Sequence, residues 1–433
     1  MNLKDKIAAQ LPAYRERVRK LIAESGHVKV GDVTISQIYG GARGVKMLVT
    51  DISYADPNEG IRLRGHTVPE VLNILPKRPG DEMPLIGGLY YLLVVGELPD
   101  FDDAIEIENE WKERSALPEY VTNVLNTMPG DTHPMNLFST AILSMQRESL
   151  FTRKYHQGMH KEEYWEPMLE DSLNLTAKLP SLAAYIYRLK YKGRTFISAD
   201  PDLDIGGNFA RMMGVEDPGY ADMSRLYFIL HSDHESGNVS AHATHMVAST
   251  LSDIYYALSA GMNGLAGPLH GLANQESLKW LLGVHDAFKG VPTWEQLRDY
   301  TWDTLNAGKV IPGYGHAVLR IADPRFTAQF KFALQHFPDD EIFQIARLVR
   351  EVVPEVLIEQ GKAKNPAPNV DAISGTLQHH YGVKEYDIYT VMFGASRALG
   401  VTANAIWARA LGQPIERPKS LTTAMLEGIA RGA

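Results

Sequence analysis

Histidines, arginines and acidic residues gather in segments of this sequence that are rich in glycine and proline, where loops at helix ends are expected. Residues 262–271 contain small residues and Pro268, and His270 lies just before a helix predicted from about residue 272. The dipole at a helix N-terminus disfavours a charged imidazole, so such a histidine can stay neutral and donate one hydrogen bond to a carbonyl oxygen. The alternative is a histidine that only caps the helix or packs against it.

A second segment, residues 310–325, combines two glycines, one histidine and two arginines. Gly313 and Gly315 let the backbone approach a ligand closely, and N–H groups exposed there can hold an anion. The alternative is a simple turn with solvated arginines. The hydrogen-bond donors beside this loop are His316, Arg320 and Arg325.

A third segment, residues 359–371, is interpreted as an ordered loop because it contains two prolines and a glycine. Lys362 and Lys364 could meet phosphate groups. Asp371 follows the apolar Val370, and a carboxylate held against apolar surface becomes more basic and can act as a general base. The alternative is that Asp371 caps the helix that follows.

Two further segments leave their roles open. Arg397 lies among small and apolar residues, where a buried arginine needs a partner such as a protein carboxylate or a dicarboxylate ligand. Residues 231–245 contain four histidines, and a metal site is one interpretation of them. Neither HExxH nor another standard zinc spacing is present, so substrate binding or helix packing by these histidines is favoured and no metal is expected.

Composition narrows the possible functions of the 433-residue chain. Its net charge of −9 argues against nucleic acid as the main partner, and the absence of cysteine excludes disulfides, thiolate metal sites and a cysteine nucleophile. No stretch approaches about 18 uninterrupted apolar residues, so no membrane span is expected. No sequence motif supports nucleotide hydrolysis or nicotinamide chemistry, because neither a P-loop nor a GxGxxG after a strand is present.

Helices must position most of these residues. Residues 341–353 carry apolar side chains at steps of three and four, and Pro354 is expected to kink or end that helix. Thr293 and Gln296 predict a capping box at the start of another helix, which Gly308 can close. Further helices are predicted at the N-terminus and near residues 181–191, 221–232, 245–260 and 274–287.

Strand patterns are sparse and lie near the N-terminus. Residues 28–35 and residues 52–63 each predict a hairpin. The remaining sequence lacks the alternation of strands and helices that a doubly wound sheet requires. The expected fold class is therefore all-α, or mainly α, with minor N-terminal β-hairpins.

Three segments together resemble citrate synthases of the mitochondrial, eukaryotic-like type. They read MNGLAGPLHGLANQ at residues 262–275, PGYGHAVLR at 312–320 and GKAKNPAPNVD at 361–371, and the likeness extends over residues 2–420. The resemblance implies a helical fold in which residues 1–271 and 379–433 form a large domain and residues 272–378 a small one. It also implies a homodimer with shared active sites and a cleft that closes on its substrates.

The resemblance assigns roles to individual residues. It implies that Asp371 removes a methyl proton from acetyl-CoA, that His270 hydrogen-bonds the thioester oxygen, and that His316 polarises the ketone of oxaloacetate. The residues implied to bind oxaloacetate are His234, Arg325, Arg397 and, from the other subunit, Arg417. Those implied to bind CoA are Val310, Gly313, Tyr314, Gly315, Arg320, Lys362, Lys364, Asn369 and Arg43.

The implied activity is the condensation of acetyl-CoA with oxaloacetate through an enol or enolate, followed by hydrolysis of citryl-CoA to citrate and CoA at the entry to the tricarboxylic acid cycle. Neither cofactor nor metal is implied. The alternatives are 2-methylcitrate synthase acting on propionyl-CoA, a metal-dependent hydrolase using residues 231–245, and a helical binding protein without activity. A mixed-charge N-terminus that begins with Met1 predicts a bacterial cytoplasmic location, with the mitochondrial matrix as the alternative.

Overall fold

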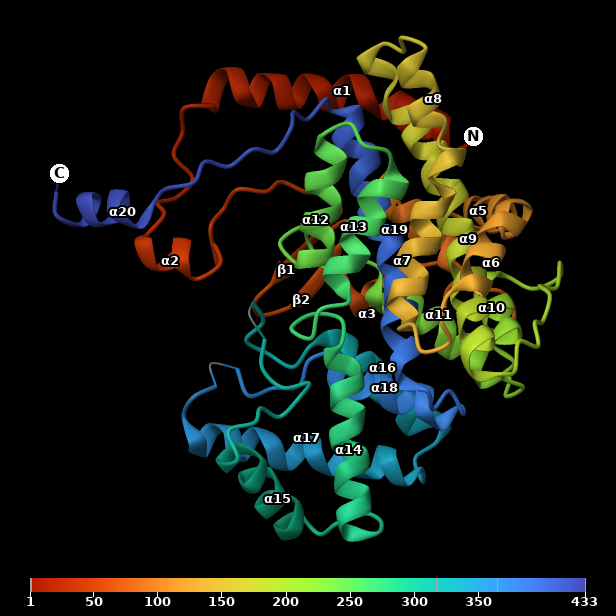
Figure 1. The fold of residues 1–433 in the computed structure, drawn as a ribbon, viewed down its shortest axis with the longest axis vertical. Coiled ribbons are helices and arrows are strands. Elements are labelled where there is room, and N and C mark those ends of the chain that lie inside the picture. Colours follow the sequence, from red (N-terminus) through yellow and green to blue (C-terminus); the bar gives the residue numbers. More distant parts are fainter. Residues whose placement is uncertain (1, 317, 364, 433) are drawn as a thin grey trace.

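Helices form almost all of the architecture in a computed structural model that describes residues 2–316, 318–363 and 365–432 (Figure 1). This finding confirms the predicted mainly α fold class. Among the described residues, no helix is both long and apolar enough to cross a bilayer. The first ten helices are α1 (Leu3–Ser25), α2 (Ile35–Tyr39), α3 (Val68–Ile74), α4 (Ile86–Val95), α5 (Phe101–Arg114), α6 (Glu119–Thr127), α7 (Pro134–Ser144), α8 (Leu150–His156), α9 (Trp165–Tyr191) and α10 (Ile205–Met213).

The later helices continue the same architecture and end in a C-terminal tail (Figure 1). They are α11 (Gly219–His231), α12 (Val239–Ser249), α13 (Ile254–Leu265), α14 (Ala273–Phe288), α15 (Trp294–Asn306), α16 (Pro324–His336), α17 (Glu341–Gln360), α18 (Asp371–His380), α19 (Tyr389–Ala410) and α20 (Thr423–Ala430). Short 3-10 helices are η1 (Met145–Glu148), η2 (Lys161–Glu163) and η3 (Tyr386–Ile388).

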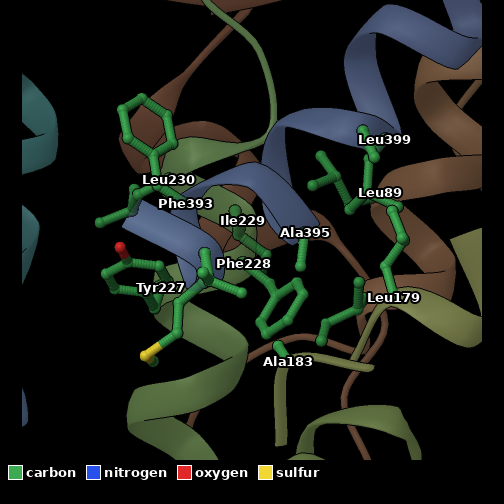
Figure 2. Packing of buried hydrophobic residues seen from close by; sticks show 14 of the residues in the cluster. Leu89, Leu179, Ala183, Tyr227, Phe228, Ile229, Leu230, Phe393, Ala395 and Leu399 are labelled. Atoms are coloured by element: carbon green, nitrogen blue, oxygen red, sulfur yellow. The ribbon is translucent and has the colours of Figure 1, made fainter. Parts of the chain in front are cut away.

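Two helices that are buried on nearly all sides organise the larger group of helices. Every residue of α4 is buried, and nearly every residue of α19 is, as expected for helices enclosed by others. Helix α19 packs against α4, α9 and α11. Figure 2 shows one part of this core, where Leu89, Leu179, Phe228 and Leu399 bring side chains from these four helices together.

Helices α14 to α18 form a second group, which lies below the first in Figure 1. Helix α14 packs against α17 and α18, α15 packs against α17, and α16 packs against α18. This group spans residues 273–380, close to the small domain predicted at residues 272–378. The division into domains stays a prediction.

A small antiparallel sheet is the only sheet among the described residues. Its strands are β1 (Ser53–Asp56), β2 (Gly60–Leu63) and β3 (His66–Thr67), in the order β1-β2-β3. In the first pair Ser53 lies opposite Leu63 and Asp56 lies opposite Gly60. The hairpin predicted at residues 52–63 is therefore confirmed.

The hairpin predicted at residues 28–35 is wrong. Those residues form no strand; the side chains of Val28 and Val30 are exposed, and no neighbouring sheet offers them a partner. An isolated two-stranded ribbon is marginal in water. Thr34 instead caps α2 through a capping box with Gln37.

Local signals placed the helix starts better than the helix ends. The Thr293 capping box and the helix after it are confirmed. Pro354 does not end α17, which runs on to Gln360, because Val356 and Leu357 beyond the proline are buried. An internal proline costs about 3 kcal/mol, and burying two such aliphatic side chains contributes an amount of similar size.

The helix predicted at residues 245–260 is two helices. Helix α12 ends at Ser249 and α13 begins at Ile254. Asp253 separates them because its carboxylate accepts hydrogen bonds from the N–H groups of Tyr255 and Tyr256, which fits a helix start.

Two stretches leave the helical body and extend to the same side (Figure 1). One comprises residues 26–49 with α2, and the other is the tail that follows α19 and contains α20. The hydroxyls of Tyr39 and Thr423 lie 2.8 Å apart and join the two stretches.

Candidate active site

Residues far apart in the sequence converge where the two groups of helices meet. His234 lies in the loop between α11 and α12, and His316 lies in the loop before α16; their ring centroids are 5.4 Å apart. Asp371 opens α18, and the charges of Arg325 and Arg397 both act on its carboxyl group. The structure thus brings together groups from four separate segments.

His270 is held in one tautomer by α12. Its Nε2 accepts a hydrogen bond of 3.2 Å from the backbone N–H of Ser240, so that nitrogen carries no proton and the proton of the neutral ring lies on Nδ1. Burial, reinforced by the charge of Arg397, lowers the pKa of His270 to about 4. At neutral pH the side chain is an uncharged donor through Nδ1–H.

His316 is held in the opposite tautomer. Its Nδ1 accepts hydrogen bonds from the backbone N–H groups of Val318 and Leu319, at 3.0 and 2.9 Å. The proton of the neutral ring therefore lies on Nε2. Burial and the charge of Arg325 lower the pKa of His316 to about 4, so this ring too is an uncharged donor.

Asp371 does not cap its helix. The residue before α18, Val370, makes no side-chain capping bond, and Asp371 is itself the first helical residue. Its Oδ1 is buried without a hydrogen-bond partner among the described residues, while its backbone N–H donates to Oδ1 of Asn369. Burial raises the pKa of Asp371 to about 6 against the opposing charge of Arg325, which favours the general-base role over the capping role.

Arg397 is buried and has no ion-pair partner among the described residues. Its Nη1 donates to Oδ1 of Asn238 at 2.9 Å and to Oγ of Ser240 at 3.2 Å, and its guanidinium lies over the ring of Phe393. Burial lowers the pKa of Arg397 to about 10, so the group stays charged at neutral pH. The strongest favourable charge acting on it is that of Asp233, which forms no direct ion pair with Arg397. A buried cation without a direct ion pair among the described residues is a natural place for a ligand carboxylate.

Arg325 is paired within the protein. Its Nη2 lies 2.6 Å from Oδ2 of Asp323, which also caps α16 through the backbone N–H of Arg325. Burial alone would raise the pKa of Asp323, but the charge and hydrogen bonds of Arg325 lower it to about 2. Arg325 therefore contributes less net positive charge to the site than Arg397 does.

His234 is a neutral group poised beside His316. Its Nε2 is buried and has no hydrogen-bond partner among the described residues. Burial and the charge of Arg325 hold the pKa of His234 well below its usual range. The ring can therefore donate to, or accept from, a ligand that binds beside it and His316.

The other histidines of residues 231–245 do not join His234 in a cluster. His231 bonds the carbonyl oxygen of Tyr227 through Nδ1, and His242 bonds Glu416 at 2.6 Å. Burial lowers the pKa of His245 to about 4. Within the described part of the chain, no group of three or more histidine or acidic side chains is arranged to hold a metal ion.

Two loops predicted to bind CoA pack against each other. The backbone N–H of Asn369 donates to the carbonyl oxygen of Gly313 at 2.9 Å, and its side chain donates to that of Gly315 at 3.0 Å. Gly313 has φ of +81°, and an added Cβ would lie 2.6 Å from Cα of Ala372, so glycine is required there. Tyr314 pairs with Pro368 in an isolated β-bridge between the loops.

The remaining predicted CoA residues are less gathered. Val310 and Lys362 are exposed, and Lys364 lies outside the described residues. Arg320 is fixed at its backbone, where its N–H donates to the carbonyl oxygen of Pro57 at 2.7 Å. Arg43 is exposed in the stretch after α2, apart from this group.

Arg417 is exposed in the tail that follows α19. The neighbouring Glu416 contacts α12, because its backbone N–H donates to Oγ of Ser249 and its carboxylate is hydrogen-bonded to His242.

The sequence interpretation missed Asn238 and Ser240, which connect Arg397 to His270. Their only visible signal was local, since Asn238 is the N-cap of α12.

The fold and the site define a mainly helical enzyme that can combine one basic carboxylate with two neutral imidazole donors beside buried arginines. The family described as "Citrate synthase, C-terminal domain" matches residues 41–419, and the chain belongs to this citrate synthase family. These findings confirm the predicted family, fold class and enzyme class.

Curated relatives match nearly the whole chain. A "Probable citrate synthase, mitochondrial" of Glossina morsitans morsitans is 51% identical over 426 residues, which are 98% of this chain and 92% of the relative. A "Citrate synthase, mitochondrial" of Xiphias gladius is 51% identical over 423 residues, with shares of 98% and 90%. These relatives support the predicted citrate synthase activity and favour none of its alternatives.

Solved structures agree in fold. The citrate synthase of Pyrobaculum aerophilum superposes with a TM-score of 0.76 at 27% identity, covering 91% of this chain and 95% of that one. The Thermotoga maritima enzyme gives 0.72 at 25% identity, covering 90% and 96%. A Thermoplasma acidophilum citrate synthase, solved as a ternary complex with carboxymethyl coenzyme A and oxaloacetate, shows the same fold with a TM-score of 0.75 at 21% identity, covering 90% and 97%.

The predicted bacterial cytoplasmic location is wrong. Three curated relatives at 50 to 51% identity are mitochondrial enzymes. The prediction depended on the residues with which the sequence begins, and these carry no information about a segment that a cell removes.

Proposed function

We propose that the chain condenses the methyl carbon of acetyl-CoA with the ketone carbon of oxaloacetate and then hydrolyses citryl-CoA to citrate and CoA, at the entry to the tricarboxylic acid cycle. The observation that carries this proposal is the pair of opposite tautomers at His270 and His316. Each ring accepts a backbone N–H through one nitrogen and so keeps the other N–H free for a substrate oxygen. Two fixed neutral donors fit a reaction that must polarise two carbonyl groups.

The first step is proton transfer from acetyl-CoA. The methyl group of a thioester is a weak acid, so a carboxylate alone removes its proton poorly. Asp371 takes the proton while the Nδ1–H of His270 donates to the thioester oxygen, where negative charge develops. The C–H bond breaks, a C=C bond forms, and the result is an enol or enolate.

The second step forms the carbon–carbon bond. The Nε2–H of His316 donates to the ketone oxygen of oxaloacetate and makes its carbon more electrophilic. The enol carbon attacks this carbon, and the ketone oxygen becomes the hydroxyl of citryl-CoA. Arg397, which forms no ion pair with the described residues, and Arg325 bind the carboxylates of oxaloacetate, with His234 beside them.

The last step is hydrolysis of the thioester. Water attacks the carbonyl carbon of citryl-CoA, the C–S bond breaks, and CoA leaves as a thiol. This proposed step involves neither an acyl-enzyme nor a metal or cofactor. CoA binds along the joined loops of Gly313, Gly315 and Asn369, with Lys362 and Lys364 near its phosphates.

A thiol-release assay tests the proposed function. Thiol should appear only when oxaloacetate and acetyl-CoA are both present, and citrate should form in equal amount. Omission of either substrate in turn is the control. A clear preference for propionyl-CoA over acetyl-CoA would replace the proposal by 2-methylcitrate synthesis, and release of thiol without oxaloacetate would make the protein a thioesterase.

A homodimer with shared active sites completes the proposal. Arg417 is exposed in the tail of its own chain, whereas Arg325 and Arg397 are buried. We propose that it enters the active site of the other subunit and binds a carboxylate of oxaloacetate there.

A further inference from the structure

We propose that the β1–β2 hairpin is a positioning element that aligns the two halves of the oxaloacetate site in the conformation that the structure describes. The inference rests on the proposed function, because it names the residues that align His234 with His316 and Arg325. None of the hairpin residues touches a substrate in this proposal. Figure 1 shows the hairpin between the upper and lower groups of helices.

Strand β1 is hydrogen-bonded to the segment that carries His234. The hydroxyl of Ser53 donates to Oδ2 of Asp233 at 2.6 Å and accepts from the backbone N–H of Glu235 at 2.7 Å. Ser53 and Asp233 are both buried. One side chain therefore fixes the residues on either side of His234.

The backbone at Glu235 needs this support. Its φ of +50° lies in the left-handed region, which is unfavourable for a residue other than glycine. Such a conformation persists only where neighbouring groups hold it. The hydrogen bond from Glu235 to Ser53 is a direct tie on that strained residue.

The turn between β1 and β2 contacts the other half of the site, at Arg320 and Pro324. The carbonyl oxygen of Pro57 accepts a hydrogen bond of 2.7 Å from the backbone N–H of Arg320. Gly60 has φ of +93°, and an added Cβ would lie 2.5 Å from both Cγ and Cδ of Pro324. Pro324 is the first residue of α16 and stands between Asp323 and Arg325.

The hairpin thus bridges two segments that belong to different groups of helices. His234 follows α11 in the upper group, whereas Arg325 opens α16 in the lower group. Hydrogen bonds that polarise a ketone lose much of their effect when donors shift by about 1 Å. We expect the hairpin to set the placement of these donors and so to control the binding of oxaloacetate.

Three single variants and one double variant test whether the hairpin is a positioning element. Ser53→Ala removes the tie to the His234 segment, and Gly60→Ala pushes on Pro324. Gly65→Ala is the matched control, because Gly65 also has a positive φ, of +88°, but nothing lies within 4 Å of the added Cβ. The double variant Gly60→Ala/Pro324→Ala restores the space that the first change fills.

The readouts are calorimetric binding of oxaloacetate to the full chain and steady-state kinetics. We expect Ser53→Ala and Gly60→Ala to weaken the Kd and raise the KM for oxaloacetate about tenfold, with the KM for acetyl-CoA changed less than about twofold. Gly65→Ala should bind oxaloacetate like the wild type. The double variant should recover a large part of the binding lost in Gly60→Ala.

Other outcomes separate this inference from the proposed function. A wild-type protein that binds no oxaloacetate contradicts the proposed function itself. If Ser53→Ala and Gly60→Ala bind oxaloacetate with wild-type affinity, the positioning role of the hairpin is overturned and the proposed function stays intact. The same holds if Gly65→Ala loses as much affinity for oxaloacetate as these two variants do. If Gly60→Ala does not fold, the comparison of Ser53→Ala with Gly65→Ala decides.

Discussion

Asp371, His270 and His316 all have pKa values moved by burial, and in each case towards the uncharged form. The pKa of the carboxyl group rises to about 6, and those of the two imidazoles fall to about 4. Above about pH 6, and so at neutral pH, the site holds one ionised base and two neutral donors. This is the combination that enolisation of a thioester needs.

Replacement of the base tests its role. Asp371→Ala should lower citrate formation by several orders of magnitude, while calorimetric binding of oxaloacetate survives, because the arginines remain. Asp339→Ala, which removes an exposed carboxylate from the same group of helices, is the control and should keep full turnover. Wild-type turnover in Asp371→Ala would refute the assignment.

The pKa of Asp371 also predicts how activity depends on pH. A protonated carboxyl group cannot accept the methyl proton, so kcat/KM for acetyl-CoA should rise with pH through about 6. The two imidazoles titrate lower and should not set this limb. A pH profile of initial rates checks this; a limb with its midpoint near 4 would contradict it.

The same pKa predicts a trade of stability for activity. The folded pKa lies above the unfolded value of 3.8, so the contribution of Asp371 to stability is present below about pH 4 and lost as the pH rises through about 6. Asp371→Asn should therefore raise the free energy of unfolding at pH 8 by up to about 3 kcal/mol and leave it nearly unchanged at pH 4. Denaturant titrations at both pH values measure this difference.

Elements with local signals were predictable from the sequence. The Thr293 capping box needs residues only three apart, and the hairpin at residues 52–63 has its own turn. The hairpin at residues 28–35 was predicted wrongly, because no neighbouring sheet is there to pair with it. Pro354 does not end its helix, because buried residues beyond it keep the helix going; a kink there stays a prediction. Such tertiary effects leave no trace in a short window of sequence.

The same limit applies to the site. The motifs around His270, His316 and Asp371 were visible as types of residue in loops, but their tautomers and hydrogen-bond partners were not. The tie from Ser240 to His270 spans 30 positions, and nothing near Ser240 in the sequence announces it.

One buried carboxylate joins two helix starts. Oε1 of Glu108 accepts from the N–H of Gly87 in α4, and Oε2 accepts from the N–H of Ile205 in α10, both at 2.8 Å. Glu108→Ala should lower the free energy of unfolding by about 3 kcal/mol, because two buried donors lose their partner. Glu106→Ala, exposed on the same helix, should change it by less than about 0.5 kcal/mol. Equal effects in denaturant titrations would contradict the double capping.

For the molecule as a whole, the role proposed for Arg417 requires a second subunit. The resemblance predicted this role in another subunit, and in this chain Arg417 is exposed beside Glu416, which is hydrogen-bonded to α12. Mixed dimers of Arg417→Ala and His270→Ala subunits should each contain one intact site, made of His270 from one chain and Arg417 from the other.

Purified mixed dimers should recover about half of wild-type turnover, although each variant alone is impaired. Such dimers can be isolated after co-expression with two different N-terminal tags. Mixed dimers of His270→Ala with His270→Ala/Arg417→Ala subunits are the control and should stay inactive. Failure of the first pair to complement would count against a shared site.

The contact between Tyr39 and Thr423 links portions of backbone 384 positions apart, outside the packed helices. The placement of the last part of the C-terminal tail, around Thr423, therefore depends on a stretch near the beginning of the chain. A single proteolytic nick between α1 and β1 would leave the imidazoles and Asp371 untouched and still loosen that last part, while Glu416 stays hydrogen-bonded to His242 in α12. If such a nick inactivates the protein, the cause would be the displaced end of the tail, because the catalytic side chains would be unchanged.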